Sequence, residues 1–340
     1  LRLAARPVIW AGGGVHRAGA SAELLALAER LGAPVVTTYL GKGAIPESHP
    51  LSIGTLVRFP AVAATVARAD LLVAVGTRFS GMSTSNWRAD LPPQTIHIDA
   101  DPGTIGRNYP VRLPVVADAK AALAAVLAAL EPVDRPDRTQ EVARLRAAAA
   151  DRARREGPRE MAVLDAVHAA LPPGAVTVHD VTLASHWAAA FLPTEEPGTF
   201  HCPYGFGTPG FSLPAAIGVA AAAPGRPVVA FAGDGGLAVH ASELATARAR
   251  GSRVTVLVFN DGSYGGLQPL ARARYGSDDG LGVPGPDLVT LAAAHGIPAA
   301  RAEEPADVGR ALADAVSGPG PRLVEVPGPW AVPPPASSWS

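Results

Sequence analysis

Short apolar runs rich in β-branched residues alternate along the chain with alanine-rich stretches of helical period. In the first third of the chain, four such runs predict strands: PVIW (7–10), PVVTT (34–38), LLVAVG (71–76) and TIHID (95–99). Between them, residues 21–31 and 60–68 have the spacing of helices. Strands that alternate with helices predict a parallel sheet with crossover helices.

The same alternation returns in the second half. It predicts helices over 160–170, 214–223 and 241–250, and strands over 175–180, 228–232, 254–260 and 323–326. Residues 131–158 are rich in Arg, Asp, Glu and Pro, which predicts an exposed, charged linker with one helix. We therefore expect the α/β class, with two doubly wound parallel-sheet domains (1–130 and 159–330), each of three α/β/α layers, and a loose tail (331–340).

Composition narrows the classes of partner. The net charge of −1 over 340 residues, with Lys and Arg dispersed, predicts no binding to nucleic acid. The longest apolar stretches, 121–130 and 213–223, are shorter than the ~20 residues that span a bilayer, so no membrane insertion is expected. The single cysteine, Cys202, excludes an internal disulfide and a cysteine-based zinc site, and it suits a reducing, cytoplasmic location. Because the first residue is Leu1, we expect residues to be missing upstream.

A single carboxylate wrapped in glycines follows one predicted strand. Asp234 comes directly after the run 228–233, and Asn260 closes the next strand, 26 residues later. That interval accommodates a loop, a crossover helix and a strand, so both side chains are expected at one edge of adjacent parallel strands. Such oxygen ligands suit Mg²⁺ bound to a diphosphate. By itself, the Gly-Asp-Gly tripeptide fits an ordinary strand-to-helix turn. The presence of Asn260 at this interval favours the metal site instead.

Neighbouring glycines extend this hypothesis. Gly233, Gly235 and Gly236 allow the backbone to approach a ligand, and the amides that open the following helix would face phosphate oxygens. The backbone carbonyl of Gly262 would supply a third metal ligand.

At this point the chain resembles the thiamine-diphosphate-dependent enzyme family that includes acetolactate synthase, benzoylformate decarboxylase and oxalyl-CoA decarboxylase, whose cofactor motif is Gly-Asp-Gly followed by Asn. Residues 204–236 and 243–268 are similar to the segments before and after that motif. Residues 6–38 and 96–123 are similar to the middle domain of the family. The resemblance implies that 1–130 is a middle domain and 159–330 the diphosphate-binding domain.

The resemblance also implies a role for each matching residue. Asp234, Asn260 and the Gly262 carbonyl would ligate Mg²⁺, and the diphosphate would be lined by Gly233, Gly235, Gly236, Tyr264 and Gly265. Gly207, Thr208 and Pro209 would contact the aminopyrimidine side, with the Gly207 carbonyl as acceptor. Pro209 stands where acetolactate synthases usually have Met. The resemblance implies that this side chain supports the cofactor in its bent conformation, so we expect that support to be altered by proline.

Two departures from the family pattern limit the expected activity. The domain that carries the activating glutamate is not in this sequence, so we expect it from a missing N-terminal domain or from a partner subunit. Leu183, Ala184 and Ser185 replace a Gln-His-Gln stretch of acetolactate synthases, which leaves decarboxylases, other lyases and carboligases open. His186 is a candidate proton carrier, although a helix histidine with satisfied hydrogen bonds is the favoured interpretation; His179 and His201 are read with the same caution.

The resulting hypothesis is a thiamine-diphosphate- and Mg²⁺-dependent lyase or ligase that acts on a 2-keto acid in a homo- or hetero-oligomer, with its site at a subunit interface. The alternative is a non-catalytic, cofactor-binding regulatory subunit. Gly12–Gly14 is expected to be a strand-to-helix turn, because Arg17 takes the place of the third glycine of a dinucleotide fingerprint. Arg78 and Phe79 alone match a longer stretch of acetolactate synthases, so FAD is not the expected cofactor.

Overall fold

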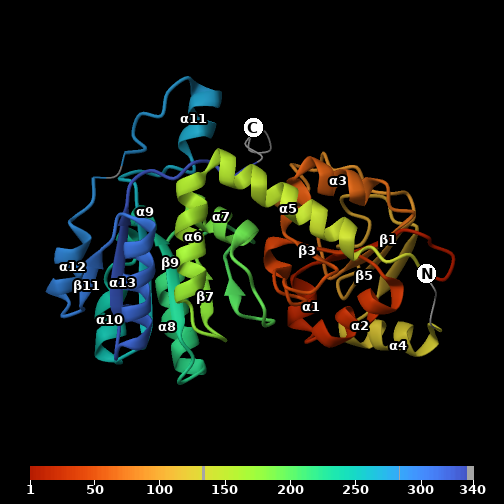
Figure 1. Ribbon diagram of the computed structural model, residues 1–340, viewed down its shortest axis with the longest axis horizontal. Helices are drawn as coiled ribbons and strands as arrows, with labels where there is room; N and C mark the ends of the chain where they lie inside the picture. The colour runs from red at the N-terminus through yellow and green to blue at the C-terminus, as the bar shows by residue number, and fades with distance from the viewer. Residues whose placement is uncertain (132–134, 283, 335–340) are drawn as a thin grey trace. The chain divides into compact units, whose positions relative to one another are not determined.

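Six parallel strands form a sheet in each half of the protein in the computed structural model, which describes residues 1–131, 135–282 and 284–334. The chain divides into two compact units. The first comprises Leu1–Arg152 and Pro193–Gly198, and the second comprises Ala153–Leu192 and the chain from Thr199 onward. Figure 1 shows both units, coloured along the chain from red to blue.

The first unit has the strand order β3-β2-β1-β4-β5-β6. Its strands are β1 (Pro7–Ala11), β2 (Val35–Thr37), β3 (Ser52–Gly54), β4 (Leu71–Val75), β5 (Thr95–Asp99) and β6 (Leu113–Val116). Its helices are α1 (Gly13–Arg17), α2 (Ser21–Leu31), α3 (Pro60–Ala67) and α4 (Ala119–Ala129), with short 3-10 turns at Tyr39–Gly41, Leu56–Arg58 and Gly81–Ser83. One face of this sheet packs on α2 and α4 through a core that includes Ile9, Val73, Leu27 and Leu123.

The second unit has the order β11-β12-β10-β9-β7-β8. Its strands are β7 (Val176–His179), β8 (Phe200–His201), β9 (Val228–Gly233), β10 (Val254–Asn260), β11 (Ala299–Arg301) and β12 (Arg322–Pro327). Its helices are α6 (Pro158–Ala170), α7 (Leu183–Phe191), α8 (Ser212–Ala222), α9 (Asp234–Val239), α10 (Glu243–Ala249), α11 (Gln268–Tyr275), α12 (Leu288–Ala294) and α13 (Pro305–Ser317).

Alternate residues of the central strands in this unit enter different cores. Along β9, Val229 and Phe231 face the core built on α6, α7 and α13. Val228, Ala230 and Ala232 face the core built on α8, α10 and α12. Because both faces of the sheet are covered, the central strands are mostly apolar, as is typical of parallel sheets. The predicted α/β class, with two parallel sheets between layers of helices, is confirmed (Figure 1).

The charged segment between the halves differs from a free linker. It contains α5 (Thr139–Glu156), and Val142 and Ala149 of that helix are buried. Just before the helix, the Arg138 guanidinium donates to the Pro7 carbonyl oxygen at 2.7 Å. Apolar residues at helical spacing thus attach α5 to the first unit, although the high charge of the segment predicts exposure. Residues 132–134 of the predicted linker and 335–340 of the predicted tail lie outside the described residues.

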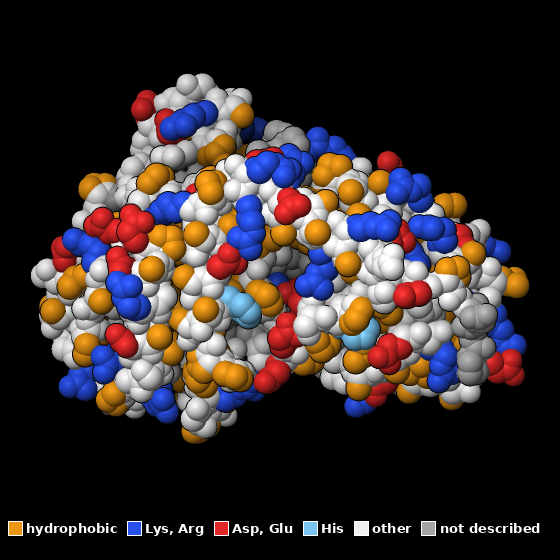
Figure 2. All heavy atoms as spheres, viewed as in Figure 1, with side chains coloured by type: hydrophobic (Ala, Val, Ile, Leu, Met, Phe, Trp, Pro, Cys, Tyr) orange, Lys and Arg blue, Asp and Glu red, His pale blue; other side chains and the backbone are white. Residues whose placement is uncertain are grey.

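Charged side chains of both signs are interspersed over the face of the molecule that Figure 2 shows, in keeping with the net charge of −1. None of the described helices combines the length and the apolar composition needed to cross a membrane.

Candidate active site

The candidate site begins where β9 and β10 end. These strands are parallel neighbours, and Gly233 at the end of β9 lies opposite Phe259 of β10. Asp234 follows directly as the first residue of α9, and Asn260 is the last residue of β10. The structure therefore places both oxygen-bearing side chains at the carboxyl edge of adjacent strands, where ligands bind in open α/β sheets.

Asp234 has the properties of a carboxylate suited to a cation. It is 8% exposed, and its Oδ2 atom has no hydrogen-bond partner among the described residues. Burial raises the pKa of this carboxyl group; the backbone amides of Gly235 and Gly262 oppose the shift, and the nearby charge of Asp261 adds to it. A buried carboxylate oxygen without a hydrogen-bond partner is costly, and a divalent ion would compensate that cost.

The side chain of Asn260 is held from two directions. The backbone N–H of Gly262 donates to its Oδ1 at 3.2 Å, and its Nδ2 donates to Glu325 Oε1 at 2.7 Å. Gly262 itself has a φ of +69°, a conformation that glycine adopts readily. Asp234, Asn260 and the Gly262 carbonyl thus form a set of hard oxygen donors that fits Mg²⁺. No group of three His, Cys, Asp or Glu side chains suits a metal ion anywhere in the described ranges, so a metal here would need amide and carbonyl oxygens in addition to the Asp234 carboxylate.

The glycines around Asp234 are required by close contacts. A Cβ atom on Gly235 would lie 2.6 Å from the ring of Tyr264, and one on Gly265 would meet the Asp261 carboxylate. Tyr264, which is partly exposed, therefore covers the first turn of α9. Glycine at these positions lets the loop after β10 lie directly against the backbone that would face a diphosphate.

A second carboxylate meets the same turn from the other side. Asp180 follows β7, which pairs with β9, and a Cβ atom on Gly236 would overlap Asp180 Oδ2. Its Oδ1 accepts from the Ser212 N–H at 2.8 Å, at the start of α8. The chain turns one way from β7 to β8 and the other way from β9 to β10, so β7 and β9 form the topological switch point of the sheet, the expected place for a ligand crevice.

The loop 203–210 carries the residues implied for the pyrimidine side. Gly207 has a φ of +83°, and its N–H donates to the Pro203 carbonyl oxygen at 2.7 Å. Thr208 and Pro209 are exposed. Gly210 attaches this loop to α9, because a Cβ atom there would lie 2.7 Å from the Gly236 carbonyl oxygen.

The three histidines occupy different environments. His186 lies in α7, is buried, and its Nδ1 atom is 2.7 Å from the Tyr204 hydroxyl oxygen. His179 at the end of β7 is fully buried and packs against the rings of Phe200 and Phe231 at 4.3 and 4.2 Å between centroids. His201 is half-buried at the end of β8. The hydrogen bond between His186 and Tyr204 agrees with the interpretation of His186 as a helix histidine whose hydrogen-bonding groups have partners.

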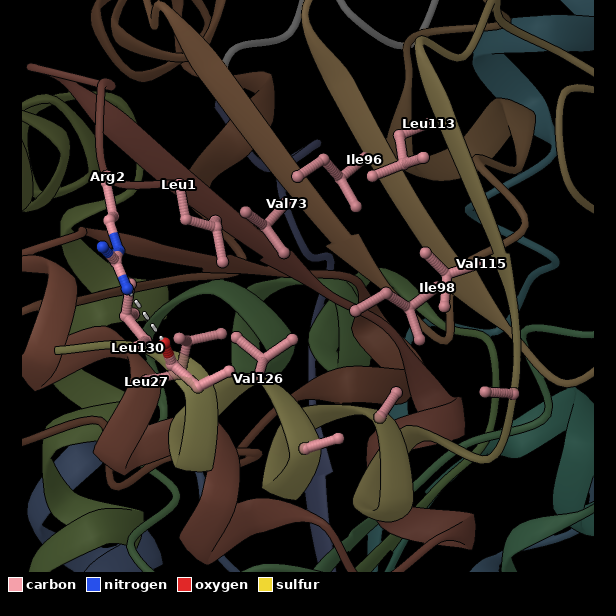
Figure 3. Close-up of a pocket in the computed structure, with 14 residues that line it drawn as sticks. Leu1, Arg2, Leu27, Val73, Ile96, Ile98, Leu113, Val115, Val126 and Leu130 are labelled. Atoms are coloured by element: carbon pink, nitrogen blue, oxygen red, sulfur yellow. Dashed lines mark hydrogen bonds between the residues drawn. The ribbon is translucent and has the colours of Figure 1, made fainter.

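The first unit contains an apolar pocket. A pocket of about 490 Å³ lies between α4 and the face of β4, β5 and β6, with Val73, Ile96 and Val126 pointing into it (Figure 3). Arg2 reaches its rim, where the guanidinium donates to the Ala129 carbonyl oxygen at 3.4 Å. This apolar lining does not suit a phosphorylated cofactor.

The turn after β1 is closely packed. A Cβ atom on either Gly12 or Gly14 would overlap backbone atoms of Gly76. Gly12–Gly14 is therefore a strand-to-helix turn in which glycine serves backbone packing, as the sequence predicts.

Three acidic residues of the site were missed in the sequence. Asp180 and Asp261 each follow a strand end, the same signal that points to Asp234. Glu325 interrupts the apolar strand LVEV, and a carboxylate in a buried strand is itself a signal of function.

Comparison with known proteins gives matches to two family models and to several relatives. Residues 1–126 match the family model described as "Thiamine pyrophosphate enzyme, central domain", and residues 180–326 match "Thiamine pyrophosphate enzyme, C-terminal TPP binding domain". A probable acetolactate synthase large subunit of Methanocaldococcus jannaschii is 37% identical over 339 residues, which cover 94% of this chain and 57% of that protein. A probable 2-ketoarginine decarboxylase of Pseudomonas aeruginosa is 33% identical, covering 96% of this chain and 58% of that protein.

Among solved structures, a thiamine diphosphate-dependent 4-hydroxybenzoylformate decarboxylase of Rhodococcus jostii RHA1 superposes with a TM-score of 0.80 at 26% identity. The match covers 96% of this chain and 62% of that one. The chain thus spans somewhat more than half the length of each of these relatives. Because both family models describe parts of one enzyme family and together match most of the chain, the protein belongs to the thiamine pyrophosphate enzyme family, of which it carries the central and the C-terminal TPP-binding domains.

Proposed function

We propose that this chain supplies the metal- and diphosphate-binding part of a thiamine-diphosphate-dependent enzyme that makes or breaks a carbon–carbon bond of a 2-keto acid. The observation that carries the proposal is the buried Oδ2 atom of Asp234, which has no hydrogen-bond partner among the described residues and lies at the strand edge that also carries Asn260. Thiamine diphosphate, when bound, supplies the electron sink that stabilises a carbanion next to the former carbonyl carbon.

The residues of the chain would bind and orient the cofactor. Asp234, Asn260 and the Gly262 carbonyl would hold Mg²⁺, and the Mg²⁺ would hold the diphosphate. Backbone at Gly233, Gly235 and Gly236 would face the phosphate oxygens, under the cover of Tyr264 and Gly265. Loop 203–210 would meet the aminopyrimidine through Gly207, Thr208 and Pro209.

Exposed apolar side chains on segments that adjoin the site residues along the chain support a second polypeptide segment in the working enzyme. Phe206, in the loop next to Gly207, is 95% exposed, and Val239, Leu267, Leu270 and Tyr275 of α9, α11 and the preceding loop are also exposed. Exposed apolar residues that gather near one site are typical of protein interfaces. We propose that a pyrimidine-binding domain, in the same polypeptide or in a partner subunit, covers them and supplies the activating glutamate.

We propose the class of substrate from the names of two relatives. One relative is named for 2-ketoarginine and another for 4-hydroxybenzoylformate, and both compounds are 2-keto acids. His186, whose Nδ1 atom is 2.7 Å from the hydroxyl oxygen of Tyr204 in the loop 203–210, is the candidate proton carrier, and this role stays a prediction.

The first experiment is a calorimetric titration of the chain with thiamine diphosphate, with and without Mg²⁺. We expect binding that requires Mg²⁺ in the wild type and is lost in Asp234→Ala, because the variant lacks the only carboxylate of the proposed metal site. Asp314→Ala, an exposed aspartate of α13, is the matched control and should bind normally. Unchanged affinity in Asp234→Ala would refute the metal assignment.

A second experiment tests catalysis. The chain is combined with a pyrimidine-binding domain of the family, and release of CO₂ from 2-ketoarginine and 4-hydroxybenzoylformate is measured. Turnover that disappears with Asp234→Ala supports an enzyme. Tight cofactor binding without turnover of any 2-keto acid would instead favour the non-catalytic subunit.

A further inference from the structure

A buried carboxylate on the strand next to β10 points at the proposed metal ligand. Glu325 lies in β12, is 2% exposed, and sits opposite Val258, two residues before Asn260. Side chains two residues apart on a strand share a face of the sheet, and paired residues of adjacent strands do as well. Glu325 and Asn260 therefore project from the same face.

That face is otherwise apolar. Val258 and Leu323, the neighbours of Glu325 on this face, belong to the core built on α8, α10 and α12. Burying an ionised side chain among apolar residues costs free energy unless the charge is paired and hydrogen-bonded. The position of Glu325 thus breaks the local pattern, as residues at functional sites do.

Both carboxylate oxygens of Glu325 are occupied by donors. Oε1 accepts from Asn260 Nδ2 at 2.7 Å, and Oε2 accepts from Arg301 Nε at 3.0 Å. Arg301 is opposite Glu325 on β11, and its Nη2 donates to Asp287 Oδ2 at 2.6 Å. Asp287 in turn caps α12 by accepting from the Thr290 N–H at 2.6 Å. A continuous chain of hydrogen bonds thus runs from a helix cap to the carboxamide of Asn260.

The orientation of that carboxamide decides whether it can ligate a metal. Only the oxygen of an amide binds Mg²⁺, and its NH₂ group would repel the ion. A carboxylate accepts and does not donate, so Glu325 draws the NH₂ group of Asn260 toward itself. The Gly262 N–H, which can only donate, independently requires an oxygen on the other side.

We propose that Glu325 is a positioning residue that holds Asn260 with its oxygen toward the metal, and that Arg301 holds Glu325 in place for this task. The inference rests on the proposed magnesium site. Partners that orient metal ligands in this way contribute substantially to affinity, and their loss typically costs about 10–100-fold.

The test is a Mg²⁺ titration of the full chain in the presence of thiamine diphosphate, with thermal unfolding of each metal-free variant to report structural damage. Glu325→Leu removes both acceptor oxygens while suiting an apolar strand, so we expect Mg²⁺ affinity to fall by roughly 10–100-fold. Glu325→Gln keeps one acceptor for Asn260 Nδ2 while losing the charge, so we expect a much smaller loss. The Gln variant therefore separates orientation from simple charge attraction.

A double variant separates orientation from a merely structural role. In an Asn260→Asp background the ligand has two equivalent oxygens and no orientation to lose. Glu325→Leu should then not lower Mg²⁺ affinity below that of Asn260→Asp alone, and it should raise the affinity where it relieves repulsion between the two adjacent carboxylates.

Equal losses of affinity from Glu325→Leu in the wild-type and Asn260→Asp backgrounds would overturn the proposal, as would wild-type affinity in Glu325→Leu. A wild-type chain that binds no Mg²⁺ would overturn the proposed function as well. These outcomes distinguish failure of the inference from failure of the site.

Discussion

Asp180 is a buried carboxylate with one satisfied oxygen. Its Oδ1 accepts from Ser212, and its Oδ2 has no partner among the residues that the structure describes and lies close to Gly236. Burial raises the pKa of Asp180, against the opposing effect of hydrogen bonds from Ser212 and neighbouring amides. Asp180 therefore links the start of α8 to the turn at Asp234. The free-energy cost of burying its carboxylate depends on pH.

The sign of this dependence follows from linkage. The folded-state pKa lies above the value of about 3.9 for an exposed Asp, so the folded protein holds the proton more tightly than the unfolded chain. The contribution of Asp180 to the free energy of unfolding is fully present below about pH 3.9 and is lost as pH rises through the raised pKa. Asp180→Asn keeps an acceptor for Ser212 and removes the titration.

We therefore expect the free energy of unfolding of the wild type, relative to Asp180→Asn, to decrease as pH rises above about 3.9 and through the raised pKa of Asp180. Urea denaturation at several pH values measures this difference. A difference that increases with pH would contradict the assigned direction of the pKa shift.

At the level of strands and helices, glycines decide how closely the connections pack. In the first unit, the turn from β1 into α1 meets Gly76 after β4, and the Cβ atom of an alanine at position 76 would lie 2.5 Å from Gly14 Cα. Gly76 also has a φ of +58°. Gly19 has nearly the same φ, +60°, but open space around it.

These two glycines form a matched pair. Gly19→Ala should cost only the strain of the left-handed conformation, about 1–2 kcal/mol. Gly76→Ala should cost more, because overpacking of backbone against backbone adds roughly 1–3 kcal/mol to the same strain. Urea denaturation of the full chain, followed by tryptophan fluorescence and circular dichroism, compares the two variants. Equal losses of stability would show that the close approach of Gly14 and Gly76 is unimportant.

Across the whole molecule, the chain does not divide at a single point. Residues Pro193–Gly198 belong to the first unit, although the residues on either side of them belong to the second. Within the first unit, the buried Glu47 holds this segment, because its Oε2 accepts from the Thr194 N–H at 3.0 Å and from Lys42 Nζ at 2.5 Å. A hydrogen bond from the Glu47 N–H to the Thr194 carbonyl oxygen, 3.1 Å, completes the attachment.

Glu47→Gln should reveal how much this attachment contributes. The variant removes the carboxylate that pairs with the buried Lys42 ammonium, so we expect a loss of about 3–5 kcal/mol in the free energy of unfolding. Lys42→Met combined with Glu47→Gln removes the buried ammonium as well and keeps an acceptor for Thr194, so most of the stability should return. Thermal and urea unfolding provide the measurement. A double variant no more stable than Glu47→Gln would show that the ion pair is not the cause.

The strand and helix pattern was readable from the sequence for many elements that carry apolar residues at their period, among them β1, β4, β9, β10, α2 and α8. The helices α4 and α13 also bury apolar residues at helical period, yet they were not predicted. β8 has two residues, β11 has three, and β6 has mostly exposed residues around a proline, so their periodicity is too weak to detect. Pairing across the sheet lets these short segments become strands.

For the candidate site, local chemistry along the chain was sufficient to select Asp234 and Asn260, because residues that end neighbouring strands must emerge at one edge of a parallel sheet. The partners of these residues come from distant segments. Asp180 reaches Gly236 because β7 pairs with β9, and Glu325 reaches Asn260 because β12 lies beside β10 rather than at the edge of the sheet. Strand order depends on how entire sheets pack, so the burial of Asp234 and the orientation of Asn260 emerge only when the chain is folded.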